Sequence, residues 1–595
     1  MLKQVTEVNA GCDSFMPVDL DIKRKPDGTI LLRSNNLLPE HDPNIVRVIM
    51  ERARFSGGKA AFADRTSKGH WRFVTFTDFA TQVRSAGQWL IDRVPRGATL
   101  MIVADNSPEV AIIFVAGLAA GLRVLPVGPG TALANDKLLR LRHIVAKSKP
   151  AVVYVDNNQR IIDSVRSVID ETCAIITAGT TLSGSIAFGD VTSTKPTPAI
   201  DKSISNLDVS TTACLMMTSG SSGLPKLVKQ SLTNMAANTA QGLATLGPIV
   251  GWHEASLDWL PWNHAAGSAV LRASLMLGGT LYIDRGKPTP DLFAETVRNL
   301  REISVPYFNN VPLGYSMLTD ALENDAEMRK TFFKRMRIMI YGGAGLPQSV
   351  KDRLQQMAFR ETGRYIPVTT GYGATETVAG CLSIHFECDK VGIGLPAPAI
   401  EMKLVPVEGR YALSLRGPNI MLGYLDEPEL TTQAFDEDGY YRTGDLVRFQ
   451  DDARPELGLV FAGRQTEEFK LSNGTWVYGG QLRTQLLDAL TPLVQDVVLC
   501  DDNKPYLSLL VWPNDETSTG KMEQIAAIVR DFNNHQKGAA SRIRRLASLV
   551  PPPNPAESEI SEKGSLVRRK IIENRTDLVD QLYADEPDGS VFVLF

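Results

Sequence analysis

The stretch Leu215–Lys226, LMMTSGSSGLPK, decides the fold class of this 595-residue chain. Its first residues form a continuous apolar run, which is typical of a strand buried on both faces, and a helix-like pattern begins near Ser231. Hydroxyls, glycines and a lysine lie between them, at Thr218, Ser219, Gly220, Ser221, Ser222, Gly223 and Lys226. Glycines let backbone amides approach an anion, hydroxyls donate hydrogen bonds, and lysine supplies a charge. A flexible surface turn is favoured for an arbitrary Ser/Gly stretch, but the strand before this one and the Pro-Lys at its end argue against that. We therefore predict a phosphate-binding loop.

Similar apolar runs recur along the chain and alternate with helical patterns. They are Thr99–Val103, Ala151–Val155, Ala213–Met217, Leu281–Ile283 and Met336–Tyr341. Continuous runs indicate parallel strands covered by helices. We predict an α/β fold with a large amino-terminal domain (residues 1–465) of mostly parallel sheets flanked by helices plus a small β-barrel-like subdomain, and a smaller mobile α+β lid (residues 466–595). The Ser-, Thr- and Pro-rich stretch Thr181–Ser210 is predicted to be a long surface connection.

Composition and charge argue against several classes of protein. Hydrophobic residues make up 43% of the chain and charged residues 22%, as in ordinary globular proteins. The formal net charge of -4 gives no bias toward nucleic acid or an anionic membrane. No signal peptide is visible, and the most apolar run, Val110–Gly121, is too short to span a bilayer. With six scattered cysteines, we expect a cytoplasmic protein with reduced thiols, without nucleic acid partners or membrane insertion; a homodimer is compatible with the sequence.

Further motifs follow the loop in order. Gly342–Pro347 (GGAGLP) follows a predicted strand, Gly371–Thr377 (GYGATET) comes next, and Tyr441–Leu446 (YRTGDL) precedes Gly463-Arg464. An aromatic face suits a purine, and carboxylates suit magnesium or the two hydroxyls of a ribose. Glu376 alone would be interpreted as a solvated glutamate.

Together these segments resemble the adenylation superfamily of acyl- and aryl-CoA synthetases, luciferases and peptide-synthetase domains. The resemblance implies an enzyme that uses ATP, Mg²⁺ and coenzyme A to convert a small-molecule carboxylic acid into an acyl-adenylate and then a thioester. It places adenine against the turn of Gly343, Ala344 and Gly345, and continues the nucleotide site through Gly371, Tyr372, Gly373, Ala374 and Thr375.

The resemblance also assigns roles to single residues. Tyr372 would stack on adenine, Thr375 would bind the α-phosphate, and Glu376 would hold the metal. Asp445 would bind both ribose hydroxyls, with Arg464 near the ribose or phosphates. Lys226 would stabilise the charge that develops on the phosphates.

The lid carries the remaining assignments. Lys563 resembles the family's mobile catalytic lysine, although it precedes Gly564 where the family has the reverse order; Lys570 is the reserve. Thr466 occupies the hinge position, which is usually Asp or Lys. Lys470 and Gly474 match the loop that reaches the site during thioester formation, and the Asn-Gly sequence there equally fits a hairpin turn.

Four segments resemble the feruloyl-CoA synthetase subgroup. They are Asp258–His264 (DWLPWNH), Tyr282–Pro290 (YIDRGKPTP), Thr296–Ile303 (TVRNLREI) and Phe469–Val477 (FKLSNGTWV). The resemblance puts His264 in the site, where it would position the carboxylate beside a flexible Gly267. The acid pocket would be lined by His264–Ser268, Asn309–Val311, Gly342–Gly345 and Gly371–Gly373.

The substrate inferred from this subgroup is a hydroxycinnamate-type, feruloyl-like aromatic acid. Ala265-Ala266 replaces a bulkier pair after the histidine, which would widen or reshape the pocket. The alternatives are a synthetase for a bulkier aliphatic or polycyclic acid, and a non-catalytic nucleotide-binding homologue. Cys381, His385 and Cys388 have zinc-like spacing, but strand packing explains them better; Arg542, Arg544 and Arg545 fit a solvated helical face better than a CoA contact.

Overall fold

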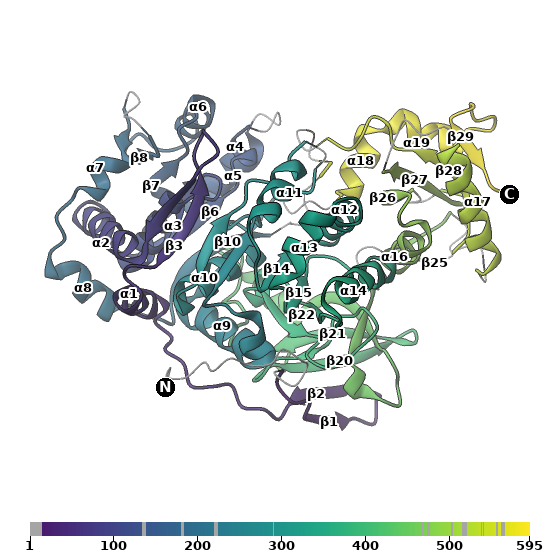
Figure 1. Ribbon diagram of the computed structural model, residues 1–595, viewed down its shortest axis with the longest axis horizontal. Helices are drawn as coiled ribbons and strands as arrows, with labels where there is room; N and C mark the ends of the chain where they lie inside the picture. Colours follow the sequence, from purple (N-terminus) through teal and green to yellow (C-terminus); the bar gives the residue numbers. More distant parts are fainter. Residues whose placement is uncertain are drawn as a thin grey trace.

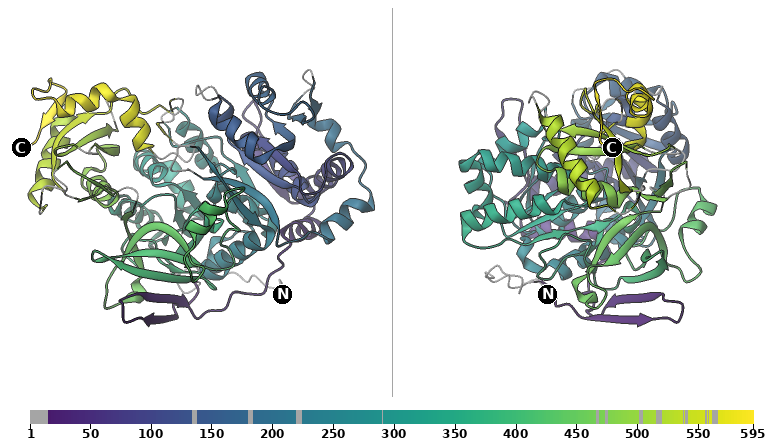
Figure 2. Two further views of the ribbon diagram at one scale, coloured as in Figure 1. Left: turned by 180° about the vertical axis from the view of Figure 1, so that it is seen from behind. Right: turned by 90° about the vertical axis from the view of Figure 1, so that its right-hand side faces the viewer.

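The computed structural model describes residues 15–595 except 134–137, 180–183, 219–223, 290, 466–467, 473–475, 501–503, 515–519, 537, 539–540, 555–556, 558 and 561–565. For residues 468–470, 476, 478 and 481 only the backbone is described. A large amino-terminal body, purple to green in Figure 1, carries a smaller carboxy-terminal unit, yellow-green to yellow, at one end. Figure 2 shows the same division from behind and from the side.

A seven-stranded sheet organises the first part of the large body. Its order is β11-β10-β6-β5-β7-β8-β9, and only β10 and β11 are antiparallel. The strands are β5 (Thr99–Val103), β6 (Arg123–Val127), β7 (Pro150–Val155), β8 (Ala174–Thr177), β9 (Ile186–Ala187), β10 (Thr212–Thr218) and β11 (Lys226–Ser231). The helices are α1 (Ile45–Phe55), α2 (Phe76–Arg93), α3 (Pro108–Ala119), α4 (Gly130–Leu133), α5 (Leu139–Ser148), α6 (Gln159–Arg166), α7 (Phe188–Thr192), α8 (Pro198–Ser205) and α9 (Leu232–Leu246). Strand β5 is buried at every position, as its continuous apolar pattern predicts.

Two smaller, mainly parallel sheets follow, ordered β12-β13-β3-β4 and β14-β15-β16. Their strands are β3 (Ala60–Arg65), β4 (Trp71–Thr75), β12 (Ala255–Asp258), β13 (Thr280–Ile283), β14 (Tyr307–Asn310), β15 (Ile338–Tyr341) and β16 (Val368–Thr370). The helices are α10 (Ala265–Leu277), α11 (Phe293–Glu302), α12 (Pro312–Asn324), α13 (Ala326–Lys334) and α14 (Gln348–Thr362). Asn310 pairs with Tyr341 and Tyr341 with Thr370, so β14, β15 and β16 end at one edge.

The expected β-barrel-like subdomain takes the form of a six-stranded antiparallel sheet, ordered β1-β2-β20-β21-β22-β23. In the described part of the chain its end strands, β1 and β23, are not paired with each other. The strands are β1 (Leu20–Arg24), β2 (Ile30–Ser34), β20 (Glu401–Val407), β21 (Arg410–Arg416), β22 (Tyr441–Phe449) and β23 (Leu459–Arg464). A small antiparallel sheet of β17 (Tyr372–Gly373), β18 (Gly380–Ser383) and β19 (Leu395–Pro396) accompanies it, with helix α15 (Pro428–Ala434).

The carboxy-terminal unit is α+β, with one four-stranded sheet ordered β26-β27-β28-β29 and a hairpin of β24 and β25. Its elements are β24 (Glu468–Lys470), β25 (Trp476–Tyr478), α16 (Gly479–Leu490), β26 (Val494–Cys500), β27 (Leu507–Pro513), α17 (Lys521–Asn534), β28 (Ile543–Ser548), α18 (Arg568–Asn574), α19 (Thr576–Tyr583) and β29 (Val591–Val593). Leu486, Val497, Leu509 and Ile525 lie in a core that belongs to this unit alone. We keep residue 466 as our proposed start of the lid.

One prediction about the chain path is wrong. The stretch Thr181–Ser210 is not a plain surface connection, because its described residues contain β9, α7 and α8. Phe188, Val191, Ile200 and Ile204 from these helices are buried in the main core. Apolar residues spaced three or four apart outweigh the polar composition between them.

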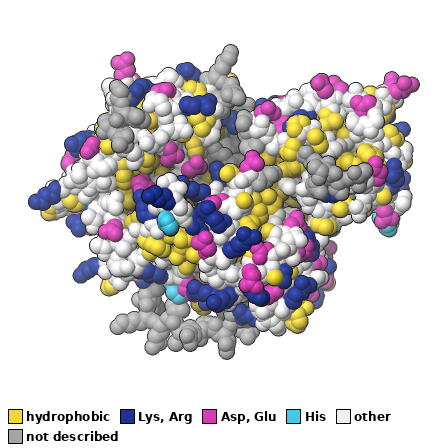
Figure 3. Space-filling model, turned by 45° about the horizontal axis from the view of Figure 1, so that its top comes forward, with side chains coloured by type: hydrophobic (Ala, Val, Ile, Leu, Met, Phe, Trp, Pro, Cys, Tyr) yellow, Lys and Arg dark blue, Asp and Glu magenta, His cyan; other side chains and the backbone are white. Residues whose placement is uncertain are grey.

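The most apolar run is buried where the sequence predicts it. Helix α3 is covered along its length, and Gly117 packs so closely that an added Cβ would lie 2.6 Å from Leu100. Among the described residues no helix is long and apolar enough to cross a membrane. On the face in Figure 3, basic and acidic side chains are interspersed, in keeping with the small net charge.

Candidate functional site

The phosphate loop connects two antiparallel strands. Thr218 at the end of β10 pairs with Lys226 at the start of β11, and the five loop residues between 218 and 224 lie outside the described residues. Helix α9 begins only after β11, where the Ser231 hydroxyl accepts from the amide of Asn234. The predicted helix start is therefore confirmed. Because β10 and β11 pair as antiparallel strands, α9 does not directly follow the predicted phosphate loop.

A tyrosine joins Lys226 to Glu376. The Lys226 Nζ lies 4.8 Å from the centre of the Tyr424 ring, and the Tyr424 hydroxyl donates to Glu376 Oε1 at 3.0 Å. Glu376 is 7% exposed. Burial, together with this carboxylate, raises the pKa of Tyr424, so its hydroxyl stays protonated and remains a donor. Tyr424 was not among the predicted site residues, because only the fold brings it to the motif.

The segment that carries Thr375 and Glu376 is fixed through its backbone. Thr375–Thr377 forms a short 3-10 helix after β17. Gln230 of β11 donates its side-chain amide to the Thr375 carbonyl at 2.8 Å, and the Met421 amide donates to the Glu376 carbonyl at 2.8 Å. Strand β11 and the segment with the predicted metal-binding residue are thus joined by a hydrogen bond from Gln230.

The predicted adenine turn lies at the shared edge of β14, β15 and β16. Gly343, Ala344 and Gly345 are exposed directly after β15. Gly343 has a φ of +85°, a left-handed conformation that favours glycine. An added Cβ on Gly342 would lie 3.4 Å from the Gly371 carbonyl, so the turn and the segment Gly371–Ala374 are neighbours. Ligands of α/β sheets bind at such carboxyl ends of parallel strands.

The predicted ribose residue has two partners in the structure. The Tyr372 hydroxyl donates to Asp445 Oδ2 at 2.7 Å, and Arg464 Nε donates to Asp445 Oδ1 at 2.8 Å. Burial and this carboxylate raise the pKa of Tyr372. Each carboxylate oxygen can accept more than one hydrogen bond, so Asp445 retains capacity for a diol. The three residues, predicted from separate motifs, are brought into direct contact.

The histidine motif is tied to the same edge. Trp259 Nε1 donates to Asn310 Oδ1 at 3.1 Å, which links the motif to the end of β14. His264 is the residue that precedes α10, and of the two alanines after it, Ala265 is buried and Ala266 is exposed. Gly267 is not a source of flexibility: an added Cβ would lie 2.3 Å from the Pro261 carbonyl oxygen. Glycine is needed there for close packing.

The sequence analysis did not identify a buried arginine on α10, the helix that follows the histidine motif. Arg272 of α10 is 2% exposed; its Nη1 donates to the Ser268 hydroxyl at 3.0 Å and its Nη2 to Asn238 Oδ1 at 3.2 Å. Asn238 in turn donates to the Gly380 carbonyl at 2.9 Å. Burial lowers the pKa of Arg272 to about 10, so it remains a cation held by neutral acceptors. The network joins the start of α10 to the strand that packs against Gly371.

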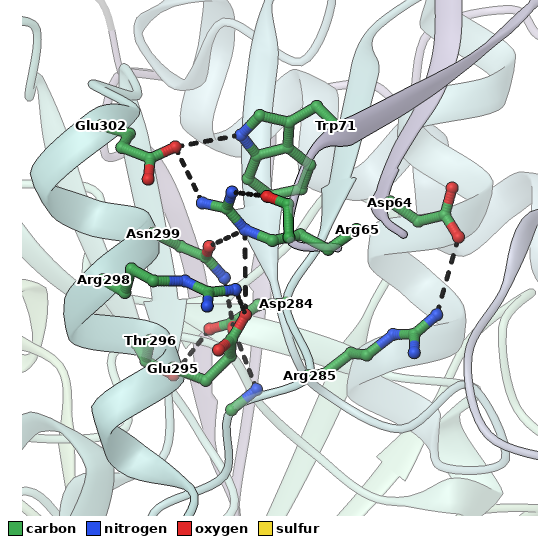
Figure 4. Close-up of polar contacts among 12 residues, drawn as sticks. Asp64, Arg65, Trp71, Asp284, Arg285, Glu295, Thr296, Arg298, Asn299 and Glu302 are labelled. Carbon is green, nitrogen blue, oxygen red and sulfur yellow. Dashed lines mark hydrogen bonds and ion pairs between the residues drawn. The ribbon is translucent and has the colours of Figure 1, made fainter. Parts of the chain in front are cut away.

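Two of the four subgroup segments fold onto each other (Figure 4). Asp284, buried at the end of β13, accepts from the Gly286 amide at 2.8 Å and the Thr296 hydroxyl at 2.6 Å. It also accepts from Asn299 Nδ2 at 3.0 Å, and Asn299 accepts from Arg65 Nε at 2.8 Å. These motif residues therefore form a buried polar network that fixes the chain after β13.

Several predicted residues of the phosphate loop and of the lid lie outside the described part of the chain. Ser219, Gly220, Ser221, Ser222 and Gly223 of the loop, and Thr466, Gly474 and Lys563 of the lid, lie outside the described residues; for Lys470 only the backbone is described. The strands β24 and β25 flank the Asn-Gly sequence as an antiparallel hairpin. Lys570, the reserve lysine, pairs with Glu573 on α18 at 2.8 Å.

The chain on both sides of residue 563 is anchored. Ile560 and Leu566 form an isolated antiparallel bridge, and both pack in a cluster that includes Leu313 of α12. Just before them, Glu559 is fully buried and accepts from Arg575 at 2.8 and 2.9 Å. The described residues on either side of the segment predicted to carry the lysine therefore share a buried cluster with Leu313 of the large body.

The weaker signals have local explanations. Cys381 is buried on β18, and burial lowers the pKa of His385 to about 4. Among the described residues, no three potential ligands lie close enough together to hold a metal ion. The expected helical face for the basic cluster is wrong, because Arg544 and Arg545 lie on β28. Arg545 donates to the carbonyls of Leu582 and Ala584, and the guanidinium of Arg544 lies over the Tyr506 ring.

Two family models and several known proteins match this chain. Residues 49–425 match the model of the AMP-binding enzyme family, and residues 468–587 match that of the AMP-binding enzyme C-terminal domain. The chain is 24% identical over 482 residues to 4-coumarate–CoA ligase 4 of Arabidopsis thaliana, covering 76% of this chain and 80% of the relative. It is also 24% identical over 533 residues to the long-chain-fatty-acid–CoA ligase FadD15 of Mycobacterium bovis, covering 81% and 84%. The fold is similar to that of the anthranilate CoA ligase AuaEII in complex with anthranoyl-AMP, with a TM-score of 0.72 at 18% identity over 90% of this chain and 98% of that one.

Proposed function

We propose that this chain, an ATP-dependent, AMP-forming acid–CoA ligase of the AMP-binding enzyme family, acts on a hydroxycinnamate-type aromatic acid. We further propose that one group of the site residues serves adenylation and another serves thioester formation. Because the chain is an AMP-forming ligase, the alternative that it is a non-catalytic nucleotide-binding homologue is excluded. The observation that carries the proposal is the junction of two contact chains, Lys226–Tyr424–Glu376 and Tyr372–Asp445–Arg464, with the carboxyl edge of β14, β15 and β16.

In the first half-reaction a carboxylate oxygen attacks the α-phosphorus of ATP and pyrophosphate leaves. Lys226 and the loop of residues 218–223 hold the departing phosphates, and Thr375 binds the α-phosphate. Asp445 binds the ribose while Tyr372 and the turn at Gly343 enclose the adenine. Donors fixed in advance stabilise developing charge without reorganising, which is how such sites lower the barrier.

The residues present fit a magnesium ion. Glu376 offers one buried carboxylate, and one of its oxygens is already oriented by Tyr424. Magnesium is usually held by one or two carboxylates together with substrate phosphates, so a site with a single protein carboxylate is in keeping with it. When bound, the ion neutralises charge on the phosphates. Glu376 therefore has the role of metal ligand in our proposal.

In the second half-reaction the CoA thiol attacks the adenylate carbonyl and AMP leaves. We assign Lys563 to adenylation, and Lys470 and Gly474 to the thioester-forming state that follows rotation of the lid about Thr466. His264 positions the carboxylate at the start of α10.

The acid is inferred from the wall of the pocket. Val311, which we expect to line the pocket, packs in one buried cluster with Trp259, and Trp259 Nε1 donates to Asn310 Oδ1. An apolar wall backed by an aromatic ring suits an aromatic acid. The exposed Ala266 leaves room beside it, which supports a bulkier aliphatic or polycyclic acid as the second candidate. Relatives at equal identity bear names from both classes.

ATP–pyrophosphate exchange with a panel of acids tests the proposal. Ferulate and 4-coumarate should support exchange, and CoA should convert the adenylate to thioester and AMP. Exchange with long-chain or polycyclic acids, and none with hydroxycinnamates, would establish the second candidate. No exchange with any aromatic acid would refute the proposed substrate.

A further inference from the structure

Helix α14, which begins directly after the adenine turn, lacks an N-terminal cap of its own. The preceding residue is Pro347, whose side chain cannot accept a hydrogen bond, and no acidic residue lies in the first turn. The first amides of a helix need acceptors, and a carboxylate there is further favoured by the helix dipole. The helix has no side-chain acceptor at its own start, so any protein acceptor for these amides comes from elsewhere in the chain.

The lid supplies it. Asp488 of α16 accepts from the Gln348 amide through Oδ1 at 2.6 Å. Burial raises the pKa of Asp488, and the amides of Gln348 and Ser349 oppose that rise by favouring the carboxylate. A carboxylate of one body therefore caps a helix of the other body, at its junction with the adenine turn.

Other contacts accompany this cap. A pocket between the two bodies is lined by Val311, Pro312, Leu313, Ser316, Ala344, Gly345 and Pro347 on one side and by Arg483, Leu487, Thr491, Gln495 and Asp496 on the other. An added Cβ on Gly345 would lie 3.9 Å from the Thr484 hydroxyl. The cap thus belongs to an interface that touches both the adenine turn and the wall of the acid pocket.

The described residues on either side of the proposed lysine lie close to this region. Leu313 of α12 belongs to the same buried cluster as Ile560 and Leu566, which flank residue 563 in sequence. One residue of the large body thus belongs both to the pocket beside the cap and to this cluster.

We propose that Asp488 is a positioning residue: by capping α14 across the interface, it holds the lid in the arrangement used for adenylation. The inference rests on the proposed function only in its assignment of Lys563 to the first half-reaction. Rotation of the lid breaks this cap, since the carboxylate leaves with α16. Asp488 therefore favours adenylation over thioester formation and touches no substrate.

Hydrogen exchange at the start of α14 tests the cap without any substrate. In Asp488→Ala, amides of the peptide covering residues 346–354 should exchange about fivefold faster, since loss of a cap costs on the order of 1 kcal/mol. Asp488→Asn should restore most of the protection, because an asparagine oxygen also caps. The matched control is Asp325→Ala, which removes a carboxylate that caps α13 through the Met328 amide within the large body and should leave the amides of residues 346–354 unchanged.

Kinetics of the separate half-reactions test the positioning role. ATP–pyrophosphate exchange by Asp488→Ala, with whichever acid of the panel is active, should be about fivefold slower. Conversion of the supplied adenylate of the same acid to thioester should be unchanged, with Asp325→Ala like wild type in both assays. Unaltered exchange protection would overturn the cap, and equal slowing of both half-reactions would overturn its link to adenylation. Failure of the hydroxycinnamate proposal would leave the hydrogen-exchange result unaffected.

Discussion

Removing one hydroxyl tests whether the Lys226–Tyr424–Glu376 chain works as a unit. Tyr424→Phe keeps the ring beneath the Lys226 ammonium and removes only the donor to Glu376. A hydrogen bond to a charged group contributes about 1.5–3 kcal/mol, because an unsatisfied buried partner is left behind. Glu376 is 7% exposed, so water does not readily replace the donor.

The expected loss follows from that energy. Tyr424→Phe should slow ATP–pyrophosphate exchange by roughly 10- to 150-fold, and half-maximal activity should need more magnesium, since an unfastened Glu376 orients its oxygens less well. The assay is exchange measured across a magnesium titration at saturating ATP and acid.

A second tyrosine offers a matched control. The Tyr440 hydroxyl donates to Glu401 at 2.9 Å in the antiparallel sheet, with the same chemistry and no part in the site. Tyr440→Phe should therefore leave exchange and its magnesium dependence unchanged. If Tyr424→Phe behaves like Tyr440→Phe, the hydroxyl does not orient the proposed metal ligand and the reasoning is wrong.

Three further perturbations have defined outcomes. Tyr372→Leu should weaken ATP binding, measured by calorimetry, more than Tyr372→Phe, which loses only the bond to its aspartate partner; equal effects would rule out a stacking role. Gly267→Ala should lower the unfolding free energy by about 1–3 kcal/mol through overpacking, whereas Gly242→Ala, whose added Cβ meets nothing within 4 Å, should not destabilise the protein in the same denaturation series. Burial opposes ionisation of Glu559, but the hydrogen bonds from its arginine partner outweigh burial, and the pKa of Glu559 lies below the ordinary 4.5. The contribution of Glu559 to the unfolding free energy is therefore complete above pH 4.5 and is lost as the pH falls through the lowered pKa. Glu559→Gln should flatten this acid dependence of unfolding, while the exposed Glu557→Gln should not; parallel curves for wild type and Glu559→Gln would contradict the sign.

The core of the fold is predictable because local and global signals agree. The buried strand Thr99–Val103 was predicted to the residue, and Ala151–Val155 to within one, since their apolar runs have no competing interpretation. The pairing of β2 with β20 could not be predicted, because register between strands so distant in sequence leaves no local pattern. The helices inside Thr181–Ser210 were missed because short amphipathic turns are diluted by polar neighbours.

The site divides in a similar way. Motif residues such as Tyr372 and Asp445 were found because each lies in a recognisable local segment. Tyr424 and Asp488 were not, since each acts on a partner that only tertiary structure brings near: Glu376 in one case and the amide of Gln348 in the other. Residues proposed to bind substrate are easier to identify from sequence patterns than the residues that orient those binding residues.

The antiparallel sheet has a consequence for the order in which the chain can fold. Strand β2 completes its hydrogen bonding only through β20, with Ile30 beside Leu404. A ribosome releases the β1–β2 hairpin long before Glu401 is synthesised, so one edge of β2 stays open for most of translation. Strands β1 and β2 are therefore among the last elements to complete their hydrogen bonding. The finished sheet joins them to the segment that leads into the lid.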